Sequence, residues 1–167
     1  MDNYLMLDGK KYELSPELVN ALRSIDPVPE KKSPFERTEP RLPYWFIASN
    51  GGVDFDTAAA HSQFTDYRFF VGNYCTDKSL MEQRALHETL NRLLWRFSEE
   101  HGGDPEWDGR NPHISIYFDR TDGIFGCRAH EYFKSNGVTY FKDKATADAA
   151  IEEIVKPFLS AHPDFVW

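Results

Sequence analysis

The strongest constraint on the fold of this chain is a sequence pattern that occurs twice. In both copies a tyrosine is followed by Asp and Lys, and then by apolar residues at helical spacing. The aligned residues are Tyr74, Asp77 and Lys78 in the first copy and Tyr140, Asp143 and Lys144 in the second. A pattern repeated in this order indicates a structural unit that is used twice.

The apolar positions that follow also align, at a spacing five residues shorter. They are Leu86, Leu90, Leu93, Leu94 and Phe97 in the first copy and Ala147, Ile151, Ile154, Val155 and Phe158 in the second. Residues spaced by three and four positions share one face of an α-helix. The simplest interpretation is a duplicated strand-strand-helix unit whose first helix is longer by about 1.4 turns.

Capping residues define the expected helix boundaries. Asp77 and Asp143 are the predicted N-caps, although Ser79 with Glu82 offers the first helix an alternative capping box. Residues 101–103, His-Gly-Gly, stop the first helix, and Pro157 ends or kinks the second. Strands are expected at residues 44–47, 67–75, 114–118, 124–127 and 138–141.

These elements predict an α+β domain over residues 44–167, with repeat halves at about 44–103 and 104–167. Its expected architecture is an antiparallel sheet with two helices packed on one face. Before it, residues 1–25 predict a small arm, because Asp8-Gly9 is a hairpin turn signal and Ser15-Pro16 starts a short helix. Residues 26–43 contain five prolines and predict a semi-rigid linker.

Charge and cysteine content exclude some classes of function for this chain. The chain carries 19 Lys and Arg against 27 Asp and Glu, a formal net charge of −8, so direct binding to nucleic acid is not expected. The two cysteines are too few for a zinc site or a disulfide framework and fit a reducing cytoplasm. No signal-peptide pattern and no apolar run of membrane-spanning length occurs, so a membrane partner is not expected. The sequence also has no Walker loop and no dinucleotide-binding fingerprint, so no cofactor is expected.

Two motifs could carry chemistry. His87-Glu88 resembles the start of a zinc-protease helix, but Asn91 stands where the second histidine ligand is needed, and no metal is expected. His113, Ser115, Tyr117 and Asp119 alternate along one strand, so they should share a solvated face. That face could serve a phosphodiesterase or another hydrolase, but two-histidine enzymes need a second His-x-Ser/Thr motif, and residues 44–46 do not supply it.

Acidic residues concentrate in the predicted turns and could form a negative patch around an exposed Trp if the turns meet at one end of the sheet. The candidate partner-binding residues are Asp54, Asp56, Asp104, Glu106, Trp107, Asp108, Asp119 and Asp122. Such a patch suits a basic protein groove. Scattered, solvated turns are the alternative.

Four short segments follow one another in the first repeat half: Tyr44-Trp45-Phe46-Ile47, Asn50-Gly51-Gly52-Val53, Asp66-Tyr67-Arg68 and Gly72-Asn73-Tyr74. Their succession resembles a group of small proteins common in phages and prophages of Firmicutes. The second repeat half extends the resemblance to about residue 159. The segments that carry it are Ile116-Tyr117-Phe118 and Gly137-Val138-Thr139-Tyr140-Phe141, followed by Ala147, Ala150 and Ile151. Most members of the group have no assigned function, and their genomic background includes small acidic anti-CRISPR proteins. The resemblance implies no catalytic residue.

The leading hypothesis is therefore a non-enzymatic, phage-encoded protein of the host cytoplasm that binds and inhibits a host defence effector. Its most concrete form is an anti-CRISPR protein that blocks the basic nucleic-acid groove of a Cas nuclease. The alternatives are a hydrolase using the His113 strand and a virion or replication accessory protein. Formation of a homo-oligomer is compatible with each of these hypotheses.

Overall fold

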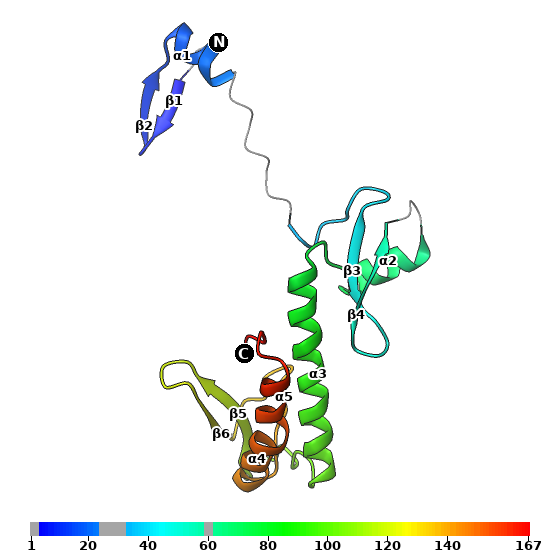
Figure 1. Ribbon diagram of the computed structural model, residues 1–167. Helices are drawn as coiled ribbons and strands as arrows, with labels where there is room; N and C mark the ends of the chain where they lie inside the picture. Colours follow the sequence, from blue (N-terminus) through cyan, green and yellow to red (C-terminus); the bar gives the residue numbers. More distant parts are fainter. Residues whose placement is uncertain (1–3, 24–32, 59–61) are drawn as a thin grey trace. The chain divides into compact units, whose positions relative to one another are not determined.

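The computed structural model describes residues 4–23, 33–58 and 62–167 (Figure 1). The chain divides into two units, Met1–Ser33 and Pro34–Trp167. The predicted linker is described only in part, because residues 26–32 lie outside the described residues. From Pro34 onward the residues belong to the larger unit, where the Pro34 carbonyl accepts a hydrogen bond from the Thr76 amide at 2.8 Å. The larger unit thus begins about ten residues earlier than the sequence predicts.

The small unit contains a hairpin of β1 (Tyr4–Leu7) and β2 (Lys10–Glu13). Asp8 and Gly9 at its tip have φ angles of 51° and 74°. Positive φ at both centre positions is the requirement of a type I′ turn, so the predicted hairpin signal is confirmed.

Helix α1 (Pro16–Arg23) follows the hairpin. The Ser15 hydroxyl accepts a hydrogen bond from the Leu18 amide at 3.3 Å, as an N-cap does. Pro16 occupies the first turn of the helix, where its missing N–H costs nothing.

The larger unit contains nine elements in its described part, named here in chain order. They are β3 (Pro43–Ile47), β4 (Val53–Thr57), α2 (Gln63–Phe70), α3 (Lys78–Glu100), β5 (His113–Asp119), β6 (Ile124–His130), α4 (Lys144–Ala150), the π-helical turn η1 (Ile151–Val155) and α5 (Lys156–Ala161). The predicted α+β class is confirmed.

The duplicated unit is visible in the backbone pairing. β3 pairs with β4, and Trp45 forms an antiparallel bridge with Cys75 just before α3. β5 pairs with β6, and Ile114 forms the same bridge with Phe141 just before α4. In one respect the structure differs from the predicted sheet: the four described strands of the larger unit form two separate two-stranded hairpins, each extended by a single bridge.

Side-chain contacts repeat in the same way. Asp77 caps α3 by accepting from the Leu80 amide at 3.1 Å, and Asp143 caps α4 by accepting from the Thr146 amide at 2.8 Å. The predicted N-caps are confirmed, and Ser79 only supports Asp77 by donating to its carboxylate at 2.7 Å.

The tyrosines that precede the two caps are equally buried. Tyr74 is 2% exposed and Tyr140 is 3% exposed. The Tyr74 hydroxyl accepts from the Thr38 amide, and the Tyr140 hydroxyl accepts from the Ser135 amide, both at 2.8 Å. Each tyrosine thus ties a neighbouring loop to its own half of the unit.

Two predicted strands are wrong. The segment predicted as a strand over residues 67–75 instead forms the end of α2 and a turn, with only Cys75 paired. Aromatic residues favour strands, but here the buried side chains are Thr65 and, partly, Phe69, which are spaced by one helical turn. The predicted strand at residues 138–141 contributes only the Phe141 bridge.

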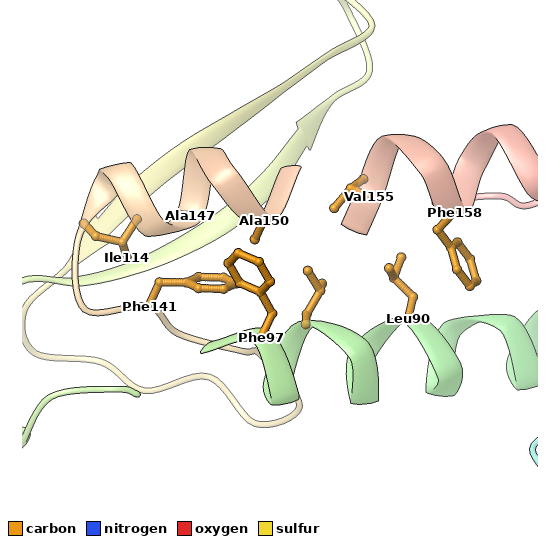
Figure 2. Packing of buried hydrophobic residues seen from close by; sticks show 9 residues of the cluster. Leu90, Phe97, Ile114, Phe141, Ala147, Ala150, Val155 and Phe158 are labelled. Carbon is orange, nitrogen blue, oxygen red and sulfur yellow. The ribbon is translucent and has the colours of Figure 1, made fainter. Parts of the chain in front are cut away.

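The main hydrophobic core lies between α3 and the α4–η1–α5 segment, against β5 (Figure 2). Its buried residues are Leu90, Leu94, Phe97, Ile114, Phe141, Ala147, Ala150, Val155 and Phe158. The aligned apolar positions of the two repeats therefore face each other across this core. Ala147 and Ala150 are fully buried, and their small side chains let α4 approach the aromatic rings closely.

The second helical segment is interrupted where Pro157 was predicted to end or kink it. Pro157 has no N–H to donate and lies in the first turn of α5. The turn immediately before it, η1, is π-helical. A π-turn inserts one residue per turn, which keeps Val155 and Phe158 buried on the core side of the segment.

Candidate functional site

Helix α2 is the element that the first repeat has and the second lacks, and it exposes an aromatic face. Phe64 is 74% exposed, Tyr67 is 66% exposed and Phe70 is 79% exposed. Val71, directly after the helix, is 64% exposed. Residues at i, i+3, i+6 and i+7 lie on one side of a helix, so these four side chains form one apolar surface, called the α2 face below.

Beside the α2 face, Arg68 fixes the helix to the β3–β4 hairpin. The Arg68 guanidinium donates to the Tyr44 hydroxyl at 2.7 Å and to the Asp56 carboxylate at 2.9 Å. It also lies 3.5 Å from the centre of the Phe46 ring. The helix is therefore held by hydrogen bonds and by a cation–π contact.

A second arginine clamps α2 from the segment that precedes β3. Arg37 donates to the Asp66 carboxylate at 2.6 Å and lies 4.5 Å from the centre of the Phe69 ring. It also lies 5.6 Å from the centre of the Phe70 ring. Arg68 and Arg37 thus anchor the helix that carries the α2 face to the β3–β4 hairpin and to the segment before it.

The Gly72-Asn73-Tyr74 turn that follows α2 has a structural role. The Asn73 amide side chain accepts from the Ile47 amide at 2.7 Å and donates to the Ile47 carbonyl at 2.8 Å. It thereby extends the pairing of β3 that the Trp45–Cys75 bridge begins. The Asn73 side chain thus pairs with Ile47 as the backbone of a neighbouring strand would.

Asp54 and Asp56, predicted as partner-binding residues, lie on β4 near α2. The Asp54 carboxylate accepts from the Phe55 amide and the Asp56 carboxylate accepts from the Thr57 amide, both at 2.8 Å. By the register of the hairpin these amides point away from β3. The two carboxylates therefore occupy the donors through which another strand would pair, as charged side chains on edge strands do.

Asp104 and Trp107, predicted in the same patch, are brought together around His113. The Asp104 carboxylate accepts from His113 Nδ1 at 2.7 Å, from Trp107 Nε1 at 2.8 Å and from Lys134 Nζ at 3.1 Å. The Trp107 and His113 rings stack with centroids 3.5 Å apart and planes 8° apart. Trp107 is half-buried and covers the histidine, so it contributes to the interior and only partly to the surface.

The surroundings of Asp104 control its ionisation. Partial burial raises the pKa of this carboxyl, but the hydrogen bonds from Trp107 and His113 and the ammonium group of Lys134 lower it by more. The net pKa lies below the ordinary value for Asp. The charged form therefore persists at neutral pH as the acceptor for three donors.

The expected solvated face of β5 is wrong at its first two positions. His113 is fully buried, and Ser115 is 6% exposed with its hydroxyl 2.8 Å from Nε2 of His130. Tyr117 and Asp119, nearer the tip of the hairpin, are more exposed. His113 Nε2 is buried without a hydrogen-bond partner among the described residues.

The remaining acidic candidates do not join one patch. Glu106 and Asp108 lie in the exposed loop beside Trp107, whereas Asp119 and Asp122 lie at the tip of the β5–β6 hairpin. His113 and Asp119 are the two ends of β5, so the two groups are roughly 20 Å apart at about 3.3 Å per residue. The acidic turns thus form separate sites.

The zinc-protease resemblance has a structural explanation. The His87 ring packs against the Phe165 ring with centroids 4.6 Å apart, and Glu88 pairs with Arg84 at 3.0 Å. Over residues 4–23, 33–58 and 62–167, no group of three His, Cys, Asp or Glu side chains could hold a metal ion. Within the same residues, no helix is both long and apolar enough to cross a membrane.

The α2 face was missed in the sequence because its aromatic residues were interpreted as a strand. A signal was present: Phe64, Tyr67 and Phe70 are spaced by three residues, which fits a helix and does not fit the two-residue period of a strand. Comparison with protein-family models, curated proteins and solved structures finds no match for this chain.

Proposed function

We propose that the chain is a non-enzymatic protein that binds a partner protein through the α2 face. The observation that carries the proposal is the exposure of three aromatic side chains on one anchored helix. Exposed contiguous apolar surface is uncommon on proteins that bind nothing, and aromatic residues are enriched among interface hot spots.

The surroundings of the face favour a partner with a basic surface. Asp54, Asp56 and Asp66 lie on the face-bearing helix or on the strand to which it is anchored, and the whole chain has a net charge of −8. A basic groove could dock its apolar floor on the aromatic rings and its cations on these carboxylates. Among basic grooves, the nucleic-acid channel of a host defence nuclease fits best with the resemblance to phage proteins.

The most concrete form of the proposal is an anti-CRISPR protein that blocks the nucleic-acid groove of a Cas nuclease. The test is a DNA-cleavage assay with a panel of purified Cas effectors, combined with co-elution on a sizing column. We expect inhibition of at least one effector. The double variant Tyr67→Ala, Phe70→Ala should weaken that inhibition about tenfold or more, because such residues contribute about 1–4 kcal/mol each at hot spots.

The matched control uses two other exposed aromatics of the same unit. Tyr132 is 73% exposed and Phe133 is 80% exposed, and both lie outside α2. The double variant Tyr132→Ala, Phe133→Ala should inhibit as the unaltered protein does. Equal loss in both double variants would reject the α2 face, and unimpaired cleavage by the whole panel would reject the anti-CRISPR form.

A hydrolase is the second candidate, favoured by one observation: the Ser115 hydroxyl is paired with His130 while His113 is paired with Asp104. The burial of Ser115 and His113 argues against a hydrolase, because a substrate would have to displace Trp107 before it could reach them. If the site is catalytic, His113→Ala abolishes turnover and leaves the melting temperature nearly unchanged. A large loss of stability instead assigns His113 to the core, which is the result we expect.

A virion or replication accessory protein is the third candidate. It would assemble with copies of itself or with other phage proteins, and sizing chromatography of the purified chain would reveal a stable oligomer. A monomer that inhibits a nuclease would leave the anti-CRISPR form as the better explanation.

A further inference from the structure

A cleft of about 320 Å³ lies between the turn of the β3–β4 hairpin and the middle of α3. It is lined by Asn50 from the turn and by Thr89, Arg92, Leu93, Trp95 and Arg96 from the helix. The volume falls at the lower end of the range of small-ligand sites, and the lining combines two apolar side chains, Leu93 and Trp95, with four polar or charged ones. None of these residues belongs to the α2 face or to the His113 cluster.

Both charged residues that line the cleft are arginines, on a chain whose net charge is −8. Their carboxylate neighbours hold them only weakly. Arg92 lies 3.7 Å from Glu88, and Arg96 lies 3.6 Å from Glu100, with all four side chains substantially exposed. Exposed ion pairs at such distances contribute little, so an anion in the cleft can engage both guanidinium groups.

The hairpin turn is shaped to bring its backbone close to Arg92. Gly51 has φ +85°, and a Cβ atom at this position would lie 3.2 Å from Arg92 Nη2 and 3.5 Å from the Thr89 hydroxyl. Arg92 Nη2 also donates to the Thr89 hydroxyl at 3.2 Å. A side chain at position 51 would therefore be strained and would crowd the guanidinium group.

Trp95 provides a planar surface beside the two cations. Its side chain is 60% exposed, although it lies on the longest helix of the described chain, and it lines the cleft three residues after Arg92 and directly before Arg96. An exposed indole next to two guanidinium groups matches a ligand that joins a flat ring system to an anionic group, because the ring stacks on the indole and the anion bridges the arginines.

We propose that this cleft binds a nucleoside monophosphate, with its base stacked on Trp95 and its phosphate held by Arg92 and Arg96. The Thr89 hydroxyl is placed to share the phosphate contact through its hydrogen bond to Arg92. The same chemistry occurs in a single-stranded nucleic acid, but the net charge of −8 repels the flanking phosphates of a strand. The free mononucleotide is therefore the assigned ligand.

The test is isothermal titration of the full chain with each of the four ribonucleoside monophosphates. Adenosine, inorganic phosphate and a single-stranded eight-nucleotide DNA are titrated alongside them. We expect saturable binding of at least one monophosphate, at least about tenfold tighter than adenosine or inorganic phosphate alone. The variant Arg92→Gln, Arg96→Gln should weaken binding at least about tenfold, and Trp95→Ala at least about fivefold.

Arg110→Gln is the matched control, because this arginine is exposed, carries the same charge and does not line the cleft. It should leave binding unchanged. Absence of saturation by any monophosphate at about 10 mM, equal weakening by the Arg110 variant, or adenosine binding as tightly as its monophosphate would each overturn the proposal. Tighter binding of the oligonucleotide than of the mononucleotide would overturn the assignment of a free nucleotide.

Discussion

Replacing Asp104 with Ala should destabilise the larger unit by about 3 kcal/mol. The carboxylate accepts hydrogen bonds from His113, Trp107 and Lys134. His113 is fully buried, so its Nδ1 would be left without an acceptor and without water, at a cost of about 1–3 kcal/mol. Trp107 is half-buried and adds about 1 kcal/mol, whereas the exposed Lys134 adds little.

Thermal unfolding followed by near-ultraviolet circular dichroism measures this effect, because the stacked Trp107 is part of the structure that is lost. A loss of about 3 kcal/mol lowers Tm by roughly 10 °C in a unit of this size. Glu106→Ala, in the same loop but exposed, is the control and should change stability by less than about 0.5 kcal/mol. Equal effects of the two substitutions would refute the assignment of Asp104 as the acceptor of a buried network.

The same network predicts a pH dependence. The pKa of Asp104 is lowered in the folded chain, so its contribution is fully present above the unfolded pKa of about 4 and is lost as pH falls through the lower folded pKa. The stability difference between the unaltered chain and Asp104→Asn should therefore be constant above about pH 5 and shrink below about pH 4. A difference that grows with acidity would contradict the sign of this linkage.

Three further predictions concern other contacts. Burial and the hydrogen bond to Asp148 raise the pKa of the Cys127 thiol to about 11, so its alkylation at pH 8 should be roughly 100-fold slower in the native chain than after unfolding, as measured by mass spectrometry. Asn73→Ala should cost about 2–3 kcal/mol in urea unfolding, because both groups of Ile47 lose their partners. Gly126→Ala should cost about 1–2 kcal/mol, because the new Cβ would lie 2.6 Å from the Tyr117 ring, and a double-mutant cycle with Tyr117→Ala should remove most of that cost.

Several elements could be predicted from residues that are close together in the sequence. Asp8-Gly9 predicted its turn because few residue pairs accept positive φ at both positions, and Asp77 and Asp143 predicted the starts of α3 and α4 because a carboxylate satisfies free amides there. The apolar positions of α3 were equally informative, because helical spacing places them on one face whatever they pack against.

The wrong predictions concern features that depend on contacts between segments distant in the sequence. Residues 67–75 are rich in aromatics and were predicted as a strand, but the side chains of α2 that are buried or partly buried, Thr65 and Phe69, are four residues apart, which is the spacing of a helix. The candidate acidic residues do not meet in one patch, again because of contacts between segments distant in the sequence. Asp104 is hydrogen-bonded to the buried His113 at one end of β5, and Asp119 lies at the other end of β5.

By itself, the sequence determined the α+β class, the duplication and the helix caps, because these depend on residues that are neighbours along the chain or share one period. Only the tertiary structure decided that His113 is buried under Trp107, that α2 exposes an aromatic face, and that Arg92, Trp95 and Arg96 border a cleft beside a hairpin turn. Burial depends on which elements pack together, and no residue pattern within one element specifies what will cover it.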